Sequence, residues 1–271
     1  MKPTRTDNDL LRCLEDCSEE QPDAAHVTTL ALAAASGRLK RMTAQAHWAL
    51  LAAALMAPRP SGALETLRQA RALPQLLPEL DALFGVPQLC EGPRWVDVGE
   101  HQWRFIDEAA RAEAPLALRF AALMHKTGKS GTPPDIWPHH HGHEQRAHAA
   151  IDALAQRAAV PAEALAMAHL AVDECDRVHR MSDMRAGAIA QLLERVQARE
   201  HPVRLDQLLL LCGCDWAAFE GHQHEQYPRA VRLRLALEAS RAAEVTGLGE
   251  EAALQARAEA IAAALGSRAR G

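Results

Sequence analysis

Apolar residues recur at helical spacing along most of the chain, and proline or glycine interrupts the pattern at intervals. The stretch Ala44–Met56 is apolar on almost every side, which predicts a buried helix. Thr43 precedes this stretch as a suitable N-cap, and Pro58 and Pro60 follow it as helix breakers. Hydrophobic residues make up 48% of the sequence but aromatic residues only 4%. The surplus is alanine and leucine, so we expect an all-α protein of about a dozen helices.

Other stretches show the same spacing and are separated by short polar segments. They are Asp9–Ala35, Gly62–Leu73, His101–Ala112, Pro115–His125, Glu144–Ala158, Pro161–Val178, Arg185–Arg199, Leu205–Leu211, Arg229–Val245 and Glu250–Leu265. Between them, Pro74–Gln88 spaces prolines with leucines and indicates a compact elbow packed on the core. Lys126–Gly142 is rich in glycine, proline and histidine, so we expect a loop of the kind that often carries a functional site.

Charge and composition narrow the classes of partner. The net charge of −5 gives no overall attraction to phosphate or anionic lipid, so any contact with RNA must be a local basic patch. No apolar run approaches the roughly 20 residues that span a bilayer, and the N-terminus carries acids where a signal peptide is apolar. We therefore expect a cytoplasmic protein without a membrane partner. The six scattered cysteines are typical of a reducing compartment.

Three motifs occur in a fixed order: LPELDALFGVPQ from Leu77, GEH ending at His101, and FAALMHKTGKSGTPPDIWPHHHGHE from Phe120. Together they resemble the HD region of bacterial tRNA CCA-adding enzymes, and the resemblance extends over roughly Ala34–Leu265. It implies a helical body packed on an HD-domain-like helical bundle. The division that follows is an N-terminal helical extension (1–33), a neck-like body (34–90), an HD-like domain (91–201) and C-terminal helices (202–271).

The nucleotidyltransferase head of that family has no counterpart in the sequence. The residues before Ala34 are too few to hold it, and no Gly-Gly turn followed by a paired Asp motif on a strand occurs. We therefore expect that this chain does not add CCA to tRNA by itself.

The resemblance also implies a metal-dependent phosphohydrolase site for phosphomonoesters and 2′,3′-cyclic phosphates. His101, His125, His143 and Asp176 stand where the family holds a divalent cation (Mg, Mn or Ni). Lys129 stands where a family lysine meets a phosphoryl oxygen. His101, His125, Lys126 and Lys129 are accordingly the candidate catalytic residues, and His179 and Asp215 occupy a later histidine and acid position.

The centre of this site departs from the family pattern. Lys126 replaces the Asp that follows His125, which exchanges an oxygen ligand for an ammonium group that repels a cation. Cys175 replaces a histidine, and the Arg-Gly-Arg expected after Asp215 is absent. Two outcomes follow: an empty site in a pseudoenzyme, or a Lys126 ammonium that attracts a phosphate in place of the metal.

Several candidate residues also have a structural interpretation. His101 and His125 are also explained as histidines that form hydrogen bonds with the backbone near helix ends. Lys129 is also explained as a solvated loop lysine. Trp137 is better explained as a residue that packs against the loop than as a platform for stacking a base. The histidine run from His139 to His143 suits a transition metal by composition alone. A basic patch for RNA or a solvated helix face accounts for Arg229, Arg232, Arg234 and Arg241.

Three functions compete on this sequence. The first interpretation is a degenerate HD-domain protein that binds tRNA or nucleotide phosphate, with residual phosphohydrolase activity at most. The alternatives are an RNA-binding remnant of the CCA-adding body without hydrolysis and a non-catalytic protein-interaction scaffold.

Overall fold

The computed structural model describes residues 5–15, 22–89, 95–181 and 184–267. Within these residues the chain forms fourteen α-helices, four short 3-10 helices and two strands of three residues each, which confirms the predicted all-α class. The helices group into two compact units, residues 1–172 with 217–221 and residues 173–216 with 222–271, and each is described by itself. The four-part division expected from the sequence stays a prediction.

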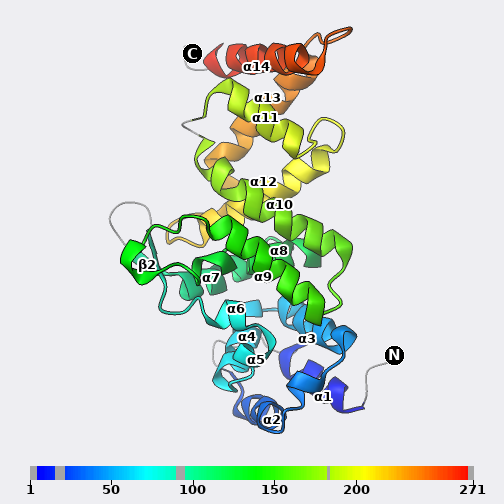
Figure 1. Cartoon of the computed structure of the whole chain (residues 1–271), viewed down its shortest axis with the longest axis vertical. Coiled ribbons are helices and arrows are strands. Elements are labelled where there is room, and N and C mark those ends of the chain that lie inside the picture. Colours follow the sequence, from blue (N-terminus) through cyan, green and yellow to red (C-terminus); the bar gives the residue numbers. More distant parts are fainter. Residues whose placement is uncertain (1–4, 16–21, 90–94, 182–183, 268–271) are drawn as a thin grey trace. The chain divides into compact units, whose positions relative to one another are not determined.

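The N-terminal part of the first unit is a cluster of helices, coloured blue to cyan in Figure 1. Its elements are α1 (Arg5–Glu15), α2 (Ala24–Ala35), η1 (Leu39–Arg41), α3 (Ala44–Met56), α4 (Pro60–Gln69), α5 (Leu73–Leu76) and α6 (Pro78–Asp81). Helix α1 packs on α3 and α4, and α2 packs on α4. Residues 16–21, inside the first expected helical stretch, lie outside the described residues.

Helix boundaries in this cluster follow from local chemistry. Helix α3 has the predicted limits, and the Thr43 hydroxyl accepts a hydrogen bond from the Ala46 N–H at 3.2 Å. Gly37 follows α2 with a φ of 67°, a left-handed conformation that suits glycine. Leu10, Leu14 and Leu55 are fully buried at the centre of the cluster. Burial of these leucines, rather than helix propensity alone, stabilises helices this short.

The rest of the first unit carries the histidine-rich motif. Its elements are β1 (Pro87–Leu89), β2 (Trp95–Asp97), α7 (Val98–Arg111), α8 (Leu116–Met124), η2 (Thr127–Lys129), η3 (Pro134–Ile136), α9 (His143–Arg157) and most of α10 (Ala162–His179). The strands pair antiparallel with Gln88 opposite Val96, a small ladder that the sequence analysis did not predict.

Helices α7 and α8 pack on each other and on the N-terminal cluster, through α4 and α3 respectively. Arg119 of α8 is buried and donates to the carbonyls of Ala114 and Leu55 at 2.8 and 2.9 Å. Burial of this guanidinium lowers the pKa of Arg119. One charged side chain thus ties the start of α8 to the end of α3.

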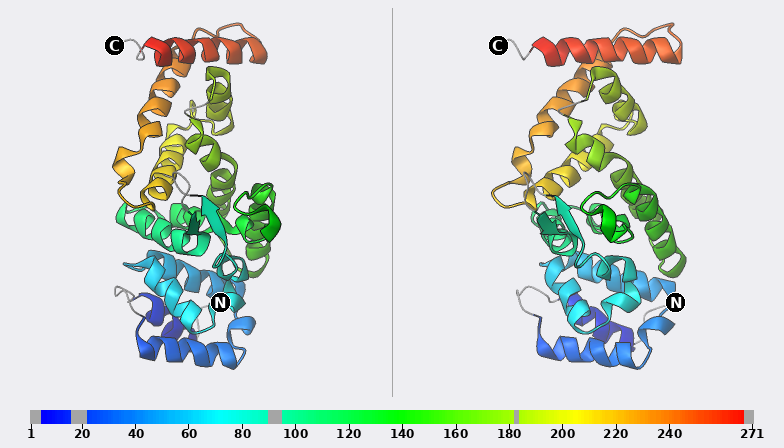
Figure 2. Two further views of the ribbon diagram at one scale, coloured as in Figure 1. Left: turned by 90° about the vertical axis from the view of Figure 1, so that its left-hand side faces the viewer. Right: turned by 60° about the vertical axis from the view of Figure 1, so that its left-hand side comes forward.

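The second unit contains the end of α10 with α11 (Ala186–Arg195), α12 (Pro202–Ala217), η5 (His224–Gln226), α13 (Pro228–Ala242) and α14 (Glu250–Ser267). Both α11 and α13 pack on α14, which Figure 2 shows in red lying across the end of α13. Glu174 is buried and accepts hydrogen bonds from Arg195 at 2.6 and 3.0 Å, so its charge is paired.

The second unit buries three cysteines, and they are free thiols, as expected from the sequence. Burial and a hydrogen bond with Cys175 raise the pKa of Cys212 well above its ordinary value. These thiols therefore pack as small apolar groups.

In the described part of the chain, no helix combines the length and apolar character needed to cross a bilayer.

Candidate functional site

Three of the predicted catalytic residues surround one aromatic ring in the first unit. The rings of His101 and His125 lie 6.5 and 6.3 Å from the Phe105 ring, measured between centroids. The Lys126 Nζ lies 5.9 Å from the centroid of the same ring. All three side chains are buried, with exposures of 0% for His101, 1% for His125 and 4% for Lys126. The structure therefore brings the two histidines and the lysine together.

The helices position these residues through simple geometry. His101 and Phe105 are four residues apart on α7, so they lie on the same face. His125 is the C-cap of α8, which packs on α7. Gln102 reinforces the contact by donating from Nε2 to the Ala122 carbonyl at 2.5 Å. The Phe219 ring covers His101 at 4.4 Å between centroids. Sequence reasoning missed Phe105 and Phe219 because neither has a polar group to mark it.

The turn after α8 packs against the start of α9. The Thr127 hydroxyl donates to the Met124 carbonyl at 2.7 Å, which continues the chain from α8 into η2. Gly128 then packs so closely on α9 that a Cβ there would lie 1.9 Å from the His143 carbonyl oxygen. Arg146 donates from Nε to the Gly128 carbonyl at 2.8 Å and closes the contact. Only glycine fits at this position.

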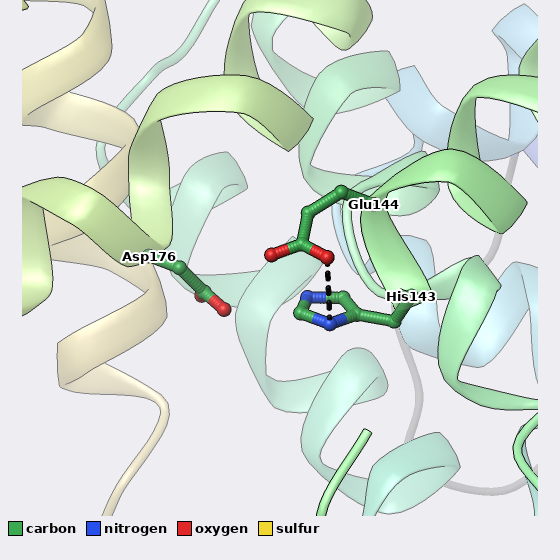
Figure 3. Close-up of side chains that lie close together, drawn as sticks. All are labelled: His143, Glu144 and Asp176. Carbon is green, nitrogen blue, oxygen red and sulfur yellow. Dashed lines mark ion pairs between the residues drawn. The ribbon is translucent and has the colours of Figure 1, made fainter. Parts of the chain in front are cut away.

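His143 begins α9, and Figure 3 shows its ring beside the Glu144 carboxylate. The His143 Nδ1 donates to the His140 carbonyl at 2.8 Å and lies 3.4 Å from the Glu144 Oε2. In the neutral ring these contacts place the proton on Nδ1 and the lone pair on Nε2, the arrangement of a histidine oriented for a ligand. Sequence reasoning missed Glu144, although it is the last residue of the quoted motif. Asp176, also drawn, belongs to the second unit.

His140 connects the loop before α9 to the strand pair. Its Nε2 donates to the Pro87 carbonyl at 2.9 Å, and its Nδ1 accepts from the Thr132 hydroxyl at 3.0 Å. Burial, reinforced by the positive charge of Lys129, lowers the pKa of His140 to about 4. The sequence analysis included His140 in a run of histidines and gave it no separate role. In the structure, both of its ring nitrogens form hydrogen bonds that hold the loop.

Two other candidates in this loop make structural contacts. The Trp137 Nε1 donates to the Thr132 carbonyl at 3.0 Å, which favours the packing interpretation. The Lys129 Nζ donates to the Gln88 Oε1 of β1 at 2.8 Å, so this lysine binds the strand. A role of Lys129 with phosphate stays a prediction.

In the second unit, His179 and Asp215 are brought together. The His179 Nε2 lies 3.1 Å from the Asp215 Oδ2, and its Nδ1 lies 2.9 Å from the hydroxyl oxygen of Tyr227. An N–H donating to Asp215 and a Tyr227 hydroxyl donating to Nδ1 satisfy both bonds. Burial raises the pKa of Tyr227, so this hydroxyl stays protonated and able to donate. Asp176, the predicted metal ligand, lies partly buried on α10.

The four arginines proposed for RNA all lie on α13 in the second unit. Arg234 is paired with Asp206 at 3.0 Å, and Arg241 donates to the Arg199 carbonyl at 2.8 Å. Arg229 lies beside the Tyr227 ring, and Arg232 is exposed. Arg232 is therefore the member of the patch that is most directly available, while Arg229 is half-buried at the start of the helix.

The described residues define an all-α protein in which two histidines and a lysine share one buried aromatic ring. Its sequence is related to those of the multifunctional CCA proteins. It is 39% identical over 217 residues to the protein of that name from Acidovorax sp. (80% of this chain, 51% of the relative). It is 40% identical over 229 residues to the protein of the same name from Paracidovorax citrulli (84% of this chain, 53% of the relative). It is 38% identical over 244 residues to the protein of the same name from Cupriavidus taiwanensis (86% of this chain, 59% of the relative).

The chain spans about half the length of the curated relatives it matches. No family model matches it. The relationship therefore covers most of this chain but leaves a large part of each relative without a counterpart in it.

Gly128→Ala tests the contact between the η2 turn and α9. Because the new methyl group would overlap the His143 backbone, we expect a loss of about 2–4 kcal/mol in the free energy of unfolding, measured by urea denaturation. Gly187→Ala in α11 is the matched control, since a Cβ there meets nothing within 4 Å. It should be neutral or stabilising by up to about 1 kcal/mol. Equal effects of the two substitutions would contradict the close approach at Gly128.

Proposed function

We propose that this chain is a degenerate HD-type protein that binds tRNA or nucleotide phosphate and has weak or no metal-dependent phosphohydrolase activity. The relationship to multifunctional CCA proteins supports the link to tRNA. The motifs around His101, His125 and His143 support the HD-type assignment, because they keep the order and spacing of the family resemblance.

The observation that carries this proposal is the buried ammonium of Lys126. It shares the Phe105 ring with His101 and His125, at the position where the resembling family has a carboxylate. An ammonium about 5 Å from a divalent cation opposes its binding by on the order of 6 kcal/mol at an effective dielectric constant near 20. That energy corresponds to several orders of magnitude in metal affinity.

The donors around Phe105 do not fit a hard divalent cation. Magnesium and manganese bind mainly oxygen ligands, whereas this cluster offers two imidazoles and an ammonium. Nickel accepts imidazole ligands, but the Lys126 charge repels it equally. These side chains therefore do not support a hydrolytic step through a metal. The same charge favours an anion, and phosphate is the anion that the family resemblance suggests.

For the RNA contact, the candidate surface is the start of α13. Arg229 and Arg232 are three residues apart and therefore project from neighbouring positions on the helix. Asp206 and the Arg199 carbonyl engage the other two arginines of the predicted patch. A small number of phosphate contacts implies weak binding with a modest dependence on salt.

Lys126→Asp tests the metal argument. Exchanging the ammonium for a carboxylate should raise the affinity for Mn²⁺ at least 10-fold, measured by isothermal titration calorimetry, which is a small part of the repulsion of about 6 kcal/mol expected from the ammonium. Lys126→Met, which removes the charge without adding a ligand, should give a smaller gain. Hydrolysis of a 2′,3′-cyclic nucleotide should rise little, because Cys175 and the residues after Asp215 also depart from the family pattern. Stoichiometric Mn²⁺ binding by the unaltered protein, together with turnover of the cyclic nucleotide, would refute the proposal.

Arg229→Ala/Arg232→Ala tests the RNA contact. Each lost phosphate contact should lower the slope of log affinity for tRNA against log salt concentration by roughly 0.9, measured by fluorescence anisotropy. Arg38→Ala/Arg41→Ala removes two arginines at the same spacing from the first unit and should leave the slope unchanged. Absence of tRNA binding in every form, together with a copurifying protein, would favour the scaffold alternative.

A further inference from the structure

Two histidines outside the motif face each other across neighbouring helices of the first unit. His148 is on α9 and His169 is on α10, and their Nδ1 atoms lie 2.6 Å apart. The rings are nearly parallel, with 4.9 Å between centroids and an interplanar angle of 21°. Neither histidine stands at a position that the family resemblance uses. Two imidazole nitrogens that point at each other are the basic element of a transition-metal site.

A carboxylate orients one of the two rings. The Asp152 Oδ1 lies 3.3 Å from the His169 Nε2. This contact favours a proton on the His169 Nε2 and leaves the lone pair on its Nδ1, directed at His148. Metal-binding histidines commonly donate their second ring N–H to a carboxylate in this way.

The charges around the pair also favour a cation. Glu144, His148 and Asp152 follow one another at four-residue spacing, so they lie on one face of α9. Two carboxylates therefore flank His148 along its helix. Access is open, because the side chains of Asp152 and His169 are 69% and 33% exposed.

We propose that His148 and His169 bind one divalent transition-metal ion such as Zn²⁺, Ni²⁺ or Cu²⁺ through their Nδ1 atoms, with Asp152 orienting His169. Without the ion, His148 donates its Nδ1 proton to His169. With the ion, the His148 proton resides on Nε2, so both rings stay neutral and each presents a lone pair. Metal–nitrogen bonds of about 2.0–2.1 Å place the two nitrogens about 3.3 Å apart in a tetrahedral zinc site and about 2.9 Å apart at the right angle of a square-planar or octahedral site. From their separation of 2.6 Å the nitrogens therefore need to move apart by roughly 0.3–0.7 Å, within reach of side-chain rotation, and water fills the remaining coordination positions.

The choice of ion follows from the ligands. Imidazole suits zinc, nickel and copper, whereas magnesium and calcium prefer a shell of oxygen ligands. The site contains no cationic side chain among its three members, in contrast to the cluster around Phe105. Its occupancy is therefore independent of Lys126 and of the proposed function.

Calorimetric titration of the full chain with Zn²⁺ and Ni²⁺ tests the site. We expect the unaltered protein to bind one equivalent of the metal ion. The variant His148→Ala/His169→Ala should not bind this equivalent. Asp152→Asn should weaken the same equivalent by about 10–100-fold, the usual effect of removing a carboxylate that orients a metal-binding histidine. The ion should also raise the melting temperature of the unaltered protein, because it links α9 to α10 in the folded state only.

The matched control is His139→Ala/His141→Ala, which removes two other histidines with stacked rings, 6.0 Å apart between centroids. This variant and His143→Ala should both keep the equivalent. If His148→Ala/His169→Ala binds Zn²⁺ and Ni²⁺ with the stoichiometry and affinity of the unaltered protein, the proposal is wrong. Loss of the equivalent in His143→Ala alone would assign the ion to the motif instead. Neither result depends on whether Lys126→Asp behaves as expected.

Discussion

The approach of the η2 turn to the first turn of α9 constrains most of the candidate site. Gly128 contacts the His143 backbone directly, and Arg146 bonds back to the Gly128 carbonyl. Lys126 and His125 precede Gly128 by two and three residues. The contact therefore constrains the position of the end of α8 relative to the start of α9. The same contact places His143 at the start of its helix. Gly128, which has no side chain, therefore constrains how the segment that contains His125 lies relative to the segment that contains His143.

Phe105 accounts for how the fold accommodates an ammonium in a buried position. Burying a charge is costly, and the face of an aromatic ring offsets part of this cost by about 0.5–2 kcal/mol. The Lys126 Nζ lies over that ring, and the rings of His101 and His125 lie 6.5 and 6.3 Å from it between centroids. The lysine is thus built into the core of the first unit rather than extended into solvent. Lys126 and the two histidines therefore share one buried environment around Phe105.

Helix type and many helix boundaries could be predicted from the sequence because they depend on local signals. Thr43 and the prolines after Met56 bracket α3 as predicted. Helix α7 begins three residues earlier than expected, at Val98, because the Asp97 side chain caps it by accepting from the Glu100 N–H at 2.9 Å. Pairing of β1 with β2 depends on a partner strand that three isolated residues do not reveal.

The candidate site was predictable only in part, for a similar reason. The motif singled out His101, His125 and Lys126, and the structure gathers them around Phe105. The roles of Phe105 and Glu144 depend on spatial neighbours, and neither residue has an unusual local pattern. The pairing of His148 with His169 joins residues that are 21 apart in the chain, and helical spacing alone does not show that they meet.

His140 makes the histidine loop sensitive to acid in a defined range. Its folded-state pKa of about 4 lies below the ordinary value of 6.5, so the folded chain binds a proton at this ring less readily than the unfolded chain does. Above pH 6.5 both states hold a neutral ring, and its bonds to Pro87 and Thr132 are fully available. As the pH falls from 6.5 towards 4, the unfolded chain gains the proton first, and the fold loses stability. The loop that carries the motif is therefore linked to proton concentration through a histidine that has no part in the proposed chemistry.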